Sequence, residues 1–394
     1  MPHRSDERTG ARIARARAAR HLTQRELAGL AAVPHSTVTR IERGLMPVSP
    51  AVTGALARAL SVPVTELTGQ PYLDDLRRDQ LDGLIQPVRE ALDGYDLGAD
   101  PGVTPRPLPE LRVHADQLCA LVRAAQLTKA AGLLPGLITE TTASAHLMPT
   151  RQAWQTLASA YRTACDITAK LGYQDLCAVA LDRMEWAAQR ASDAVLAGVR
   201  QYLRALHCLR AADYRTGQRV VRAGLATLQQ AELGRERDAA TGQLHLGAAV
   251  LYARLGDGAA CEDHLAEAQR LAQRTGPAEQ VHWLSFGPAN VDVHRVAALA
   301  ERERYDEAVS AADSLTLPAG WPRSRTARHH AEVARAQLWT GQTDAAFRSL
   351  LRAKKAGPEQ MRYHPLVRET YAGLDAARRQ VPGSFAAFGD WLGI

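Results

Sequence analysis

The sequence predicts an all-α protein, in which a small N-terminal helical domain precedes a long series of stacked helix pairs. Alanine, leucine and arginine, all good helix formers, dominate the 394 residues, and runs of valine and isoleucine are scarce. Two short amphipathic patterns flank a tight break near the N-terminus, and two helices joined by a tight turn recur as a theme from Leu111 onward. A chain of this length divides into two or three domains.

The N-terminal domain contains two short helices whose limits are marked by single residues. Thr23 and Glu26 have the spacing of a capping box, which starts the first helix. The second helix begins near Pro34, because the fixed φ of proline suits a first helical turn, and it ends at Gly44, a residue type common just past a helix. The apolar face of the first helix is too small to form a core alone, so the pair needs neighbouring helices.

The second helix of this pair has an outer face of short polar and basic side chains. Val38 and Ile41 lie three residues apart and point inward. A helix that faces only water more commonly carries mixed Glu and Lys pairs, whereas hydroxyl groups, imidazole and guanidinium read base edges and hold phosphates in a major groove. The outer face therefore predicts a DNA-binding surface, formed by His35, Ser36, Thr39, Arg40 and Arg43.

With this helix pair, residues 8 to about 69 resemble the XRE-type, phage-repressor-like helix-turn-helix domain. The segments "ARIARARAARHLTQ", "SPAVTGALARAL" and "SVPVTEL" match its first, fourth and fifth helices. The resemblance implies a five-helix, lambda-repressor-like DNA-binding fold whose recognition helix enters the groove by its N-terminal half. By position it places four side chains near bases, those of His35, Ser36, Thr39 and Arg40. It places three others on phosphates, those of Gln24, Thr37 and Arg43.

Two residues depart from the pattern of this family. Ala32 occupies the turn position where glycine is usual, which is expected to strain the turn slightly. Pro34 replaces the hydroxyl residue that normally caps the recognition helix, and a missing cap commonly costs about 1 kcal/mol.

The distribution of charge supports a polyanionic partner for the N-terminal domain. Residues 1–70 contain ten arginines, no lysine and five acidic residues, a net charge of +5, whereas the whole chain carries +6. The remaining 324 residues are almost neutral. A small basic domain joined to a balanced large one is typical of nucleic-acid-binding proteins. The alternative is a solvated arginine-rich face without a partner.

A proline-rich stretch predicts the domain boundary. Residues 71–97 have the pattern of one amphipathic helix, and "LGADPGVTPRPLPE" then places four prolines in fourteen residues. We therefore expect a DNA-binding domain over residues 1–70, a connector helix and linker over 71–109, and a helical-repeat domain over 110–394. The connector helix is also a candidate dimerisation element.

The C-terminal part repeats a helix-pair theme in which small residues recur where two helices approach closely. The small positions are spaced by 40, 44, 47 and 38 residues, longer than the 34 residues of tetratricopeptide repeats, which the pattern nonetheless resembles. We expect a degenerate tetratricopeptide-like α-solenoid of five or six pairs, which would present a concave binding surface. The small positions are Cys177, Gly217, Cys261, Ala308 and Ala346.

Two stretches are candidates for ligand binding on that surface. In "VHWLSFGPANVDVHR", aromatic and hydrogen-bonding side chains surround a helix break, and the candidates are Trp283, Phe286, Asn290, His294 and Arg295. The alternative is that Trp283 and Phe286 fill the interior and Asn290 only caps a helix. In "VRQYLRALHCLR" the candidates are Arg200, Tyr202, Arg204 and His207, and the alternative is a solvated basic face.

Enzymatic, metal-binding and membrane functions find no support in the sequence. The five cysteines are widely spaced without a C-x-x-C pair, the histidines lack paired-ligand spacing, and neither a phosphate-binding loop nor a nucleophile motif occurs. No stretch approaches the roughly 18 apolar residues of a membrane helix, and no signal peptide is evident. We expect no cofactor, buried free thiols and a cytoplasmic, nucleoid-associated protein.

The order of these parts resembles a group of actinobacterial regulators and, more distantly, peptide-responsive quorum-sensing regulators. It implies a sequence-specific DNA-binding transcriptional regulator whose repeat domain senses a small ligand or peptide and sets the geometry of a homodimer on double-stranded DNA. The alternative is a DNA-tethered scaffold whose repeats bind a partner protein.

Overall fold

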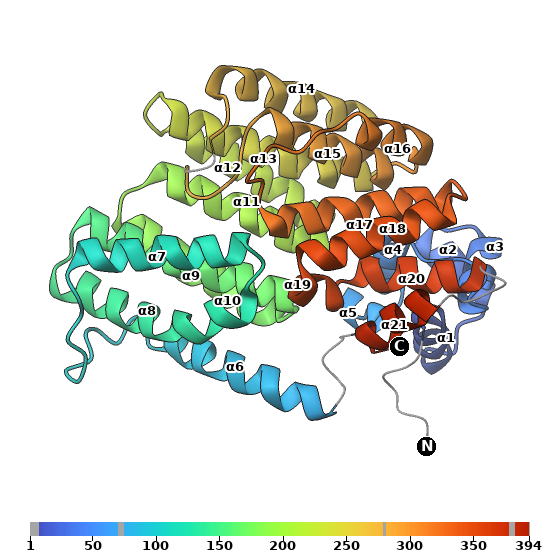
Figure 1. The fold of residues 1–394 in the computed structure, drawn as a ribbon, viewed down its shortest axis with the longest axis horizontal. Coiled ribbons are helices and arrows are strands. Elements are labelled where there is room, and N and C mark those ends of the chain that lie inside the picture. Colours follow the sequence, from blue (N-terminus) through green and yellow to red (C-terminus); the bar gives the residue numbers. More distant parts are fainter. Residues whose placement is uncertain (1–7, 70–74, 279–280, 378–382, 394) are drawn as a thin grey trace.

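The computed structural model describes residues 8–69, 75–278, 281–377 and 383–393, with no account of the side chains of residues 75–80. These residues form 21 helices and no strand (Figure 1). The all-α prediction is confirmed. A compact N-terminal group of helices lies beside a larger helical-repeat-like region, and the two are in contact.

The N-terminal group is the predicted five-helix domain. Its apolar faces meet in one core that includes Ile13, Leu27, Val38, Ile41 and Leu56. Because each short helix covers only one side of this core, the five helices stabilise one another rather than standing alone. Their limits are α1 Thr9–Ala19, α2 Gln24–Ala31, α3 His35–Glu42, α4 Pro50–Ala59 and α5 Val64–Thr68.

Six antiparallel helix pairs make up most of the remaining chain, followed by three shorter helices. The pairs are α7 Leu108–Arg123 with α8 Leu127–Leu147, α9 Arg151–Leu171 with α10 Gln174–Arg190, α11 Ala194–Arg210 with α12 Tyr214–Gln229, α13 Arg235–Arg254 with α14 Gly258–Thr275, α15 Pro288–Glu301 with α16 Tyr305–Asp313, and α17 Arg323–Trp339 with α18 Thr343–Ala356. The last three are α19 Pro358–Arg362, α20 Pro365–Ala377 and α21 Gly383–Leu392.

Helix α6, Asp75–Asp93, covers the segment expected to be a connector. It packs against α8, α9 and α10, and its Ile85, Val88 and Leu92 belong to the same hydrophobic core as the first helix pairs. The proline-rich stretch that follows is the loop between α6 and α7. Helix α6 is therefore part of the helical-repeat-like body, and the proline-rich loop lies within that body.

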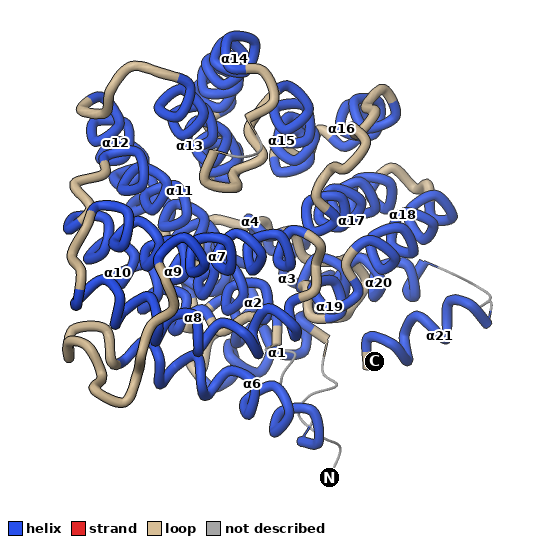
Figure 2. The backbone as a smooth tube through the Cα atoms, turned by 60° about the vertical axis from the view of Figure 1, so that its left-hand side comes forward, coloured by secondary structure: helices blue, strands red, loops and turns tan. Residues whose placement is uncertain are grey.

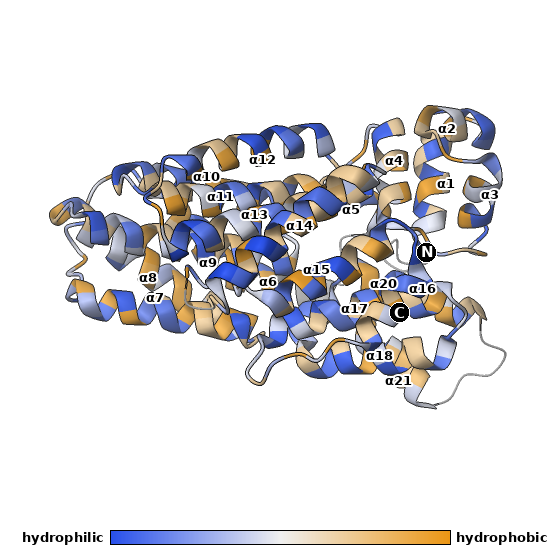
Figure 3. Cartoon of the chain, turned by 90° about the horizontal axis from the view of Figure 1, so that it is seen from above, coloured by the Kyte–Doolittle hydropathy of each residue, from blue (hydrophilic) through white to orange (hydrophobic). Residues whose placement is uncertain are grey.

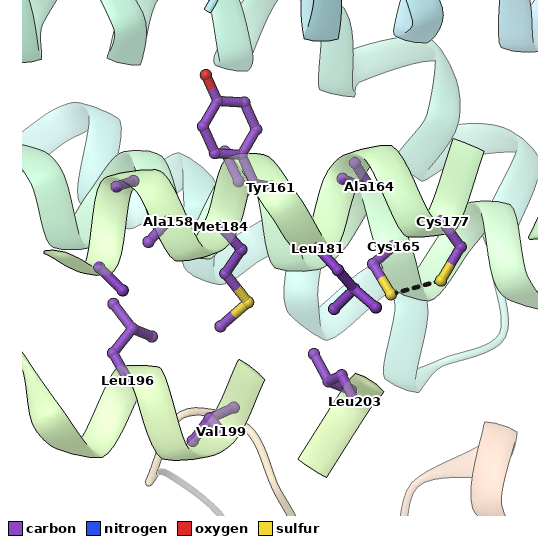
Figure 4. Packing of buried hydrophobic residues seen from close by; sticks show 14 of the residues in the cluster. Ala158, Tyr161, Ala164, Cys165, Cys177, Leu181, Met184, Leu196, Val199 and Leu203 are labelled. Atoms are coloured by element: carbon purple, nitrogen blue, oxygen red, sulfur yellow. Dashed lines mark hydrogen bonds between the residues drawn. The ribbon is translucent and has the colours of Figure 1, made fainter. Parts of the chain in front are cut away.

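Small residues permit the close packing of the helix pairs. All five predicted small positions are buried in the second helices of their pairs. A Cβ at Gly217 would lie 2.3 Å from Cδ1 of Leu251, so a larger residue there would force the Leu251 side chain to move. In the core between α9, α10 and α11, the sulfur atoms of Cys165 and Cys177 approach to 2.8 Å (Figure 4). All five cysteines are buried free thiols.

The helix pairs follow an arc that brings distant segments together (Figure 2). The first helices of successive pairs stack on one another, from α11 through α13 and α15 to α17. Helix α17 also contacts α7, and α19 contacts α8, so the end of the arc returns to its beginning. The first helices consequently surround a central space on the concave side.

Candidate functional site

The turn between α2 and α3 is fixed by local interactions. The Thr23 hydroxyl accepts from the Glu26 amide at 3.2 Å, and the Thr23 amide donates to the Glu26 carboxylate at 2.7 Å, which completes the predicted capping box. Ala32 adopts a left-handed conformation with φ of 53°, the conformation that glycine adopts without strain. Pro34 precedes α3 without a side-chain cap, and Gly44 follows its end with φ of 69°.

Helix α3 presents its polar face outward. Val38 and Ile41 are buried in the domain core, whereas the opposite side chains remain accessible. In Figure 3, α3 lies on the side of the five-helix domain away from the helical-repeat-like body. No other part of the described chain covers this face. The side chains predicted to contact DNA are exposed in His35, Ser36, Arg40 and Arg43 and half-buried in Gln24, Thr37 and Thr39.

A polar network connects α1, α2 and α3 behind this face. Arg17 donates from Nε and Nη2 to the two oxygens of Glu42 at 2.7 and 2.9 Å. The Gln24 side chain donates from Nε2 to the same carboxylate at 2.7 Å, and the Thr39 hydroxyl donates to the side-chain oxygen Oε1 of Gln24 at 2.9 Å. The hydrogen bond to Glu42 raises the pKa of Arg17, which therefore stays charged. Gln24 and Thr39 are thus held in fixed orientations before any DNA arrives.

Sequence reasoning missed Arg17 and Glu42, although one signal was available. An acidic side chain in the last turn of a helix opposes the helix dipole, so Glu42 needs a compensating cation. Its side chain is only 5% exposed, and the fork of Arg17 satisfies both of its oxygens. The pair fixes how α3 sits on α1 and α2.

Comparison with known families identifies this unit. A helix-turn-helix domain family matches residues 8–68. This segment is a helix-turn-helix DNA-binding domain of XRE-like type. Domains of this family are typically non-enzymatic. No curated protein and no solved structure matches the chain.

The helix-turn-helix domain docks on the helical-repeat-like body through the elements opposite α3. Arg58 of α4 donates to the Ala212 carbonyl at 2.9 Å and lies over the ring of Tyr214, 5.2 Å from its centroid. A Cβ at Gly54 would lie 2.6 Å from the Ala212 Cβ, so α4 approaches this turn closely. Arg8 pairs with Asp375 of α20 at 3.3 Å. These docking contacts come from α4 and from Arg8, directly before α1, and leave the α3 face accessible.

A cavity of about 680 Å³ lies between the docked domain and the concave side of the helix pairs. Its wall includes residues of α7, α9, α11, α13, α15, α17 and α20, together with residues from α4 and α5 of the helix-turn-helix domain. The volume is within the range of small-molecule sites. Both parts of the chain thus contribute to the wall, and the helix-turn-helix domain supplies residues such as Thr53, Val64 and Thr68.

Four of the candidate ligand residues lie on the cavity wall, namely Tyr202, His207, Trp283 and His294. Trp283 donates from its indole nitrogen to Asp116 at 2.9 Å, and its carbonyl accepts from Arg123 and Arg162, each at 3.3 Å. His294 donates from Nδ1 to the Asn290 carbonyl oxygen at 2.7 Å, and burial followed by the nearby Arg325 lowers its pKa to about 3. His294 is therefore neutral at physiological pH.

The other candidates lie off the cavity wall. Phe286 fills the interior against Gly242, and Asn290 is buried in the first turn of α15, where it bonds Gln243 at 3.0 Å rather than capping the helix. Arg200 is buried beside α10 and pairs with Asp182 at 3.0 Å and Glu185 at 3.3 Å. Arg204 is exposed and Arg295 half-buried, and neither belongs to the wall.

Among the residues that the structure describes, no cluster of three or more histidine, cysteine and acidic side chains has an arrangement that would hold a metal ion. None of the described helices combines the length and the hydropathy needed to cross a lipid bilayer.

Proposed function

We propose that this protein is a sequence-specific transcriptional regulator, acting on double-stranded DNA in the cytoplasm, whose repeat region senses a small ligand or peptide. The observation that carries the DNA-binding part is the accessible polar face of α3, on a basic domain that docks through other surfaces. The assignment of the repeats as tetratricopeptide-like rests on the sequence pattern of small residues. The resemblance to actinobacterial regulators rests on the order of the domains.

Within this proposal, the side chains predicted to contact DNA, from α2, α3 and the end of α3, divide into two roles. His35, Ser36, Thr39 and Arg40 approach base edges, and Gln24, Thr37 and Arg43 contact phosphates. Phosphate contacts contribute affinity for every sequence, whereas base contacts contribute preference for one.

Two matched arginine variants test the division, because both side chains are exposed and neither has a partner in the described part of the chain. Arg40→Ala is expected to weaken binding to the selected operator by about 1–3 kcal/mol and to relax base preference. Arg43→Ala is expected to weaken binding to every duplex and to reduce the salt slope by about one. The operator is first selected from a random duplex library. Equal losses of Arg40→Ala on the operator and on random duplexes would reject its base-reading role.

The sensing part of the proposal is supported by the cavity shared between the two regions. A ligand shifts a conformational equilibrium only if it binds one state better than the other. Because α4 and α5 supply one wall, a ligand in the cavity contacts the helix-turn-helix domain directly. Its affinity then depends on whether that domain is docked. Ligand binding would then be coupled to the position of α3. The factor by which the ligand changes the affinity for DNA would equal the factor by which DNA changes the affinity for the ligand.

We also propose that the protein binds DNA as a homodimer. One domain of this size reads few base pairs, and two copies on half-sites about 34 Å apart, or a multiple of that, would supply the missing affinity. The docked position of the domain would then set the spacing. Arg58→Ala removes the bond to Ala212 and is expected to broaden the half-site spacings accepted by the dimer, with affinity for a single half-site unchanged. The control is Arg20→Ala, and equal spacing preference in both variants would contradict the geometric role of docking.

A further inference from the structure

The wall of the cavity carries more positive than negative charge. Four acidic side chains line it, those of Asp166, Asp175, Glu332 and Glu369. Seven cationic side chains line it, those of Arg123, Arg162, Lys170, Arg210, Arg254, Arg325 and Arg328. Charges inside a partly enclosed space are screened less than charges on an open surface, so this imbalance sets the chemistry that the cavity favours.

Each of the four acids is already engaged. Carboxylates that have cationic or hydrogen-bonding partners are poorly placed to neutralise other arginines. The partners are Lys170 at 3.2 Å and Arg162 at 3.8 Å for Asp166, Arg89 at 3.3 Å for Asp175, Arg328 at 2.5 Å and Arg335 at 3.2 Å for Glu332, and the Thr9 hydroxyl for Glu369.

Two arginines of the wall lack a carboxylate at ion-pair distance in the described part of the chain. Arg325 is half-buried and donates only to neutral oxygens, the Asn290 side chain at 3.0 Å and the Leu284 carbonyl at 2.8 Å. Arg210 is accessible on the wall and has no hydrogen bond or ion pair among the described residues, although its charge acts on Asp166 through space. Both guanidinium groups remain available to a ligand.

Two histidines of the cavity wall have a lowered pKa, first because they are buried and then because arginines lie nearby. Burial and then Arg325 and Arg328 lower the pKa of His294. Burial and then Arg328, Arg210 and Arg254 lower the pKa of His364. Arginines from α11, α13 and α17 thus act together on the same region of the cavity.

The rest of the wall suits the apolar body of a small molecule. Several residues of the wall also carry buried polar atoms without a hydrogen-bond partner, among them His207 Nδ1, His329 Nδ1 and Gln360 Oε1. Buried polar groups are normally satisfied, so these atoms add unused hydrogen-bonding capacity close to the cavity. The apolar part of the wall comprises Val122, Tyr202, Leu203, Leu206, Val250, Trp283 and Leu366.

We propose that the cavity binds an organic anion: a carboxylate, sulfonate or phosphate group in the field of Arg210 and Arg325, joined to an apolar body against the hydrophobic wall. This inference rests on the proposed sensing function and names the chemical class of its ligand. Arginine suits the charged group because its fork donates two parallel hydrogen bonds to a carboxylate or phosphate.

A pair of dyes that differ only in charge tests the proposal on the full chain. Anilinonaphthalene sulfonate is the anionic probe, and N-phenylnaphthylamine is the same aromatic body without the sulfonate. Fluorescence titration is expected to show one site per chain and at least tenfold tighter binding of the anion, which corresponds to about 1.4 kcal/mol. Naphthoate and naphthyl phosphate, added as competitors, then distinguish a carboxylate from a phosphate ligand.

Variants assign the charge preference to the cavity. Arg210→Gln, whose side chain makes no bond in the described structure, is expected to reduce the anion preference severalfold, and Arg325→Gln is expected to do the same. Arg204→Gln, on the same helix but outside the cavity wall, is the matched control and is expected to retain the preference. Thermal melting of each variant confirms that it is folded.

Three outcomes would overturn the proposal: equal affinity for the two dyes, an anion preference that survives both cavity substitutions, or no binding of either dye. Each is distinguishable from a failure of the DNA-binding proposal, because the Arg40 and Arg43 measurements use neither dye nor cavity variants. Binding of the neutral dye alone would leave sensing intact while rejecting the anionic class.

Discussion

Replacing Glu42 with glutamine is predicted to loosen the recognition helix without changing its exposed face. The carboxylate accepts three hydrogen bonds, two from Arg17 and one from Gln24, at 2.7 to 2.9 Å. An amide retains one acceptor and turns its NH2 group toward at least one of these donors. Hydrogen bonds to charged groups contribute about 1.5–3 kcal/mol each, and removing an acid from the end of a helix returns at most about 1 kcal/mol. We expect a net loss of about 2–3 kcal/mol.

Hydrogen exchange followed by mass spectrometry measures this effect in the full chain. A loss of 2–3 kcal/mol accelerates exchange of the α3 amides by about 30- to 150-fold, if exchange follows the opening equilibrium. Glu66→Gln is the matched control, because it removes the same charge from an exposed site on α5. Exchange in Glu42→Gln within threefold of the control would refute the reasoning. A double-mutant cycle with Arg17→Met then isolates the pair, since removing both partners is expected to cost less than the two single losses combined.

The other predictions concern backbone strain, a buried ion pair and acid stability. Ala32→Gly is expected to stabilise the helix-turn-helix domain by about 1 kcal/mol, because glycine adopts positive φ without strain; unchanged or faster exchange in α2 and α3 would contradict this. Glu301→Gln disrupts the buried ion pairs of Glu301 with Arg254 at 3.0 Å and with Arg335 at 3.2 Å. We expect it to destabilise the repeats by about 3–5 kcal/mol in urea unfolding, and a loss below about 1 kcal/mol would contradict this prediction. Burial lowers the pKa of His294 to about 3 in the fold, against about 6.5 in the unfolded chain, so below pH 6.5 the unfolded chain binds the extra proton. Stability therefore decreases as the pH falls, by about 2 kcal/mol at pH 5. His294→Gln is expected to flatten this acid limb in pH-dependent melting, and an unaltered limb would exclude His294 as its source.

The helix-turn-helix domain was predictable from the sequence because its determinants are local. The capping box of Thr23 and Glu26 spans three residues, and the break at Gly44 needs only one residue that tolerates positive φ. The buried positions Val38 and Ile41 follow from helical periodicity. The ion pair of Arg17 with Glu42 lies beyond such rules, because its partners are 25 residues apart and belong to different helices.

The cavity was only partly predictable, since its wall depends on contacts between distant segments. The sequence drew attention to residues 281–295 because a helix break carries aromatic groups there, and Trp283 and His294 do line the cavity. The sequence around this break does not indicate which side each residue faces. Phe286, which fills the interior, was therefore as strong a candidate as Trp283 and His294. The arginines that approach Trp283 come from positions 160 and 121 residues earlier in the chain, and no periodicity links such positions.

The strength of the docking contacts bears on the proposed coupling between ligand binding and DNA binding. The pair between Arg8 and Asp375 is exposed and contributes at most about 1 kcal/mol, whereas the part-buried bond from Arg58 to the Ala212 carbonyl is charge-assisted and contributes about 1.5–3 kcal/mol. Reversing a two-state equilibrium from 1:99 to 99:1 requires about 5.5 kcal/mol of differential ligand affinity. The polar docking contacts contribute less free energy than this. A ligand that prefers another position of α4 and α5 by that amount therefore outweighs them. A cavity walled by both regions places that ligand where its preference acts directly on the domain that holds α3.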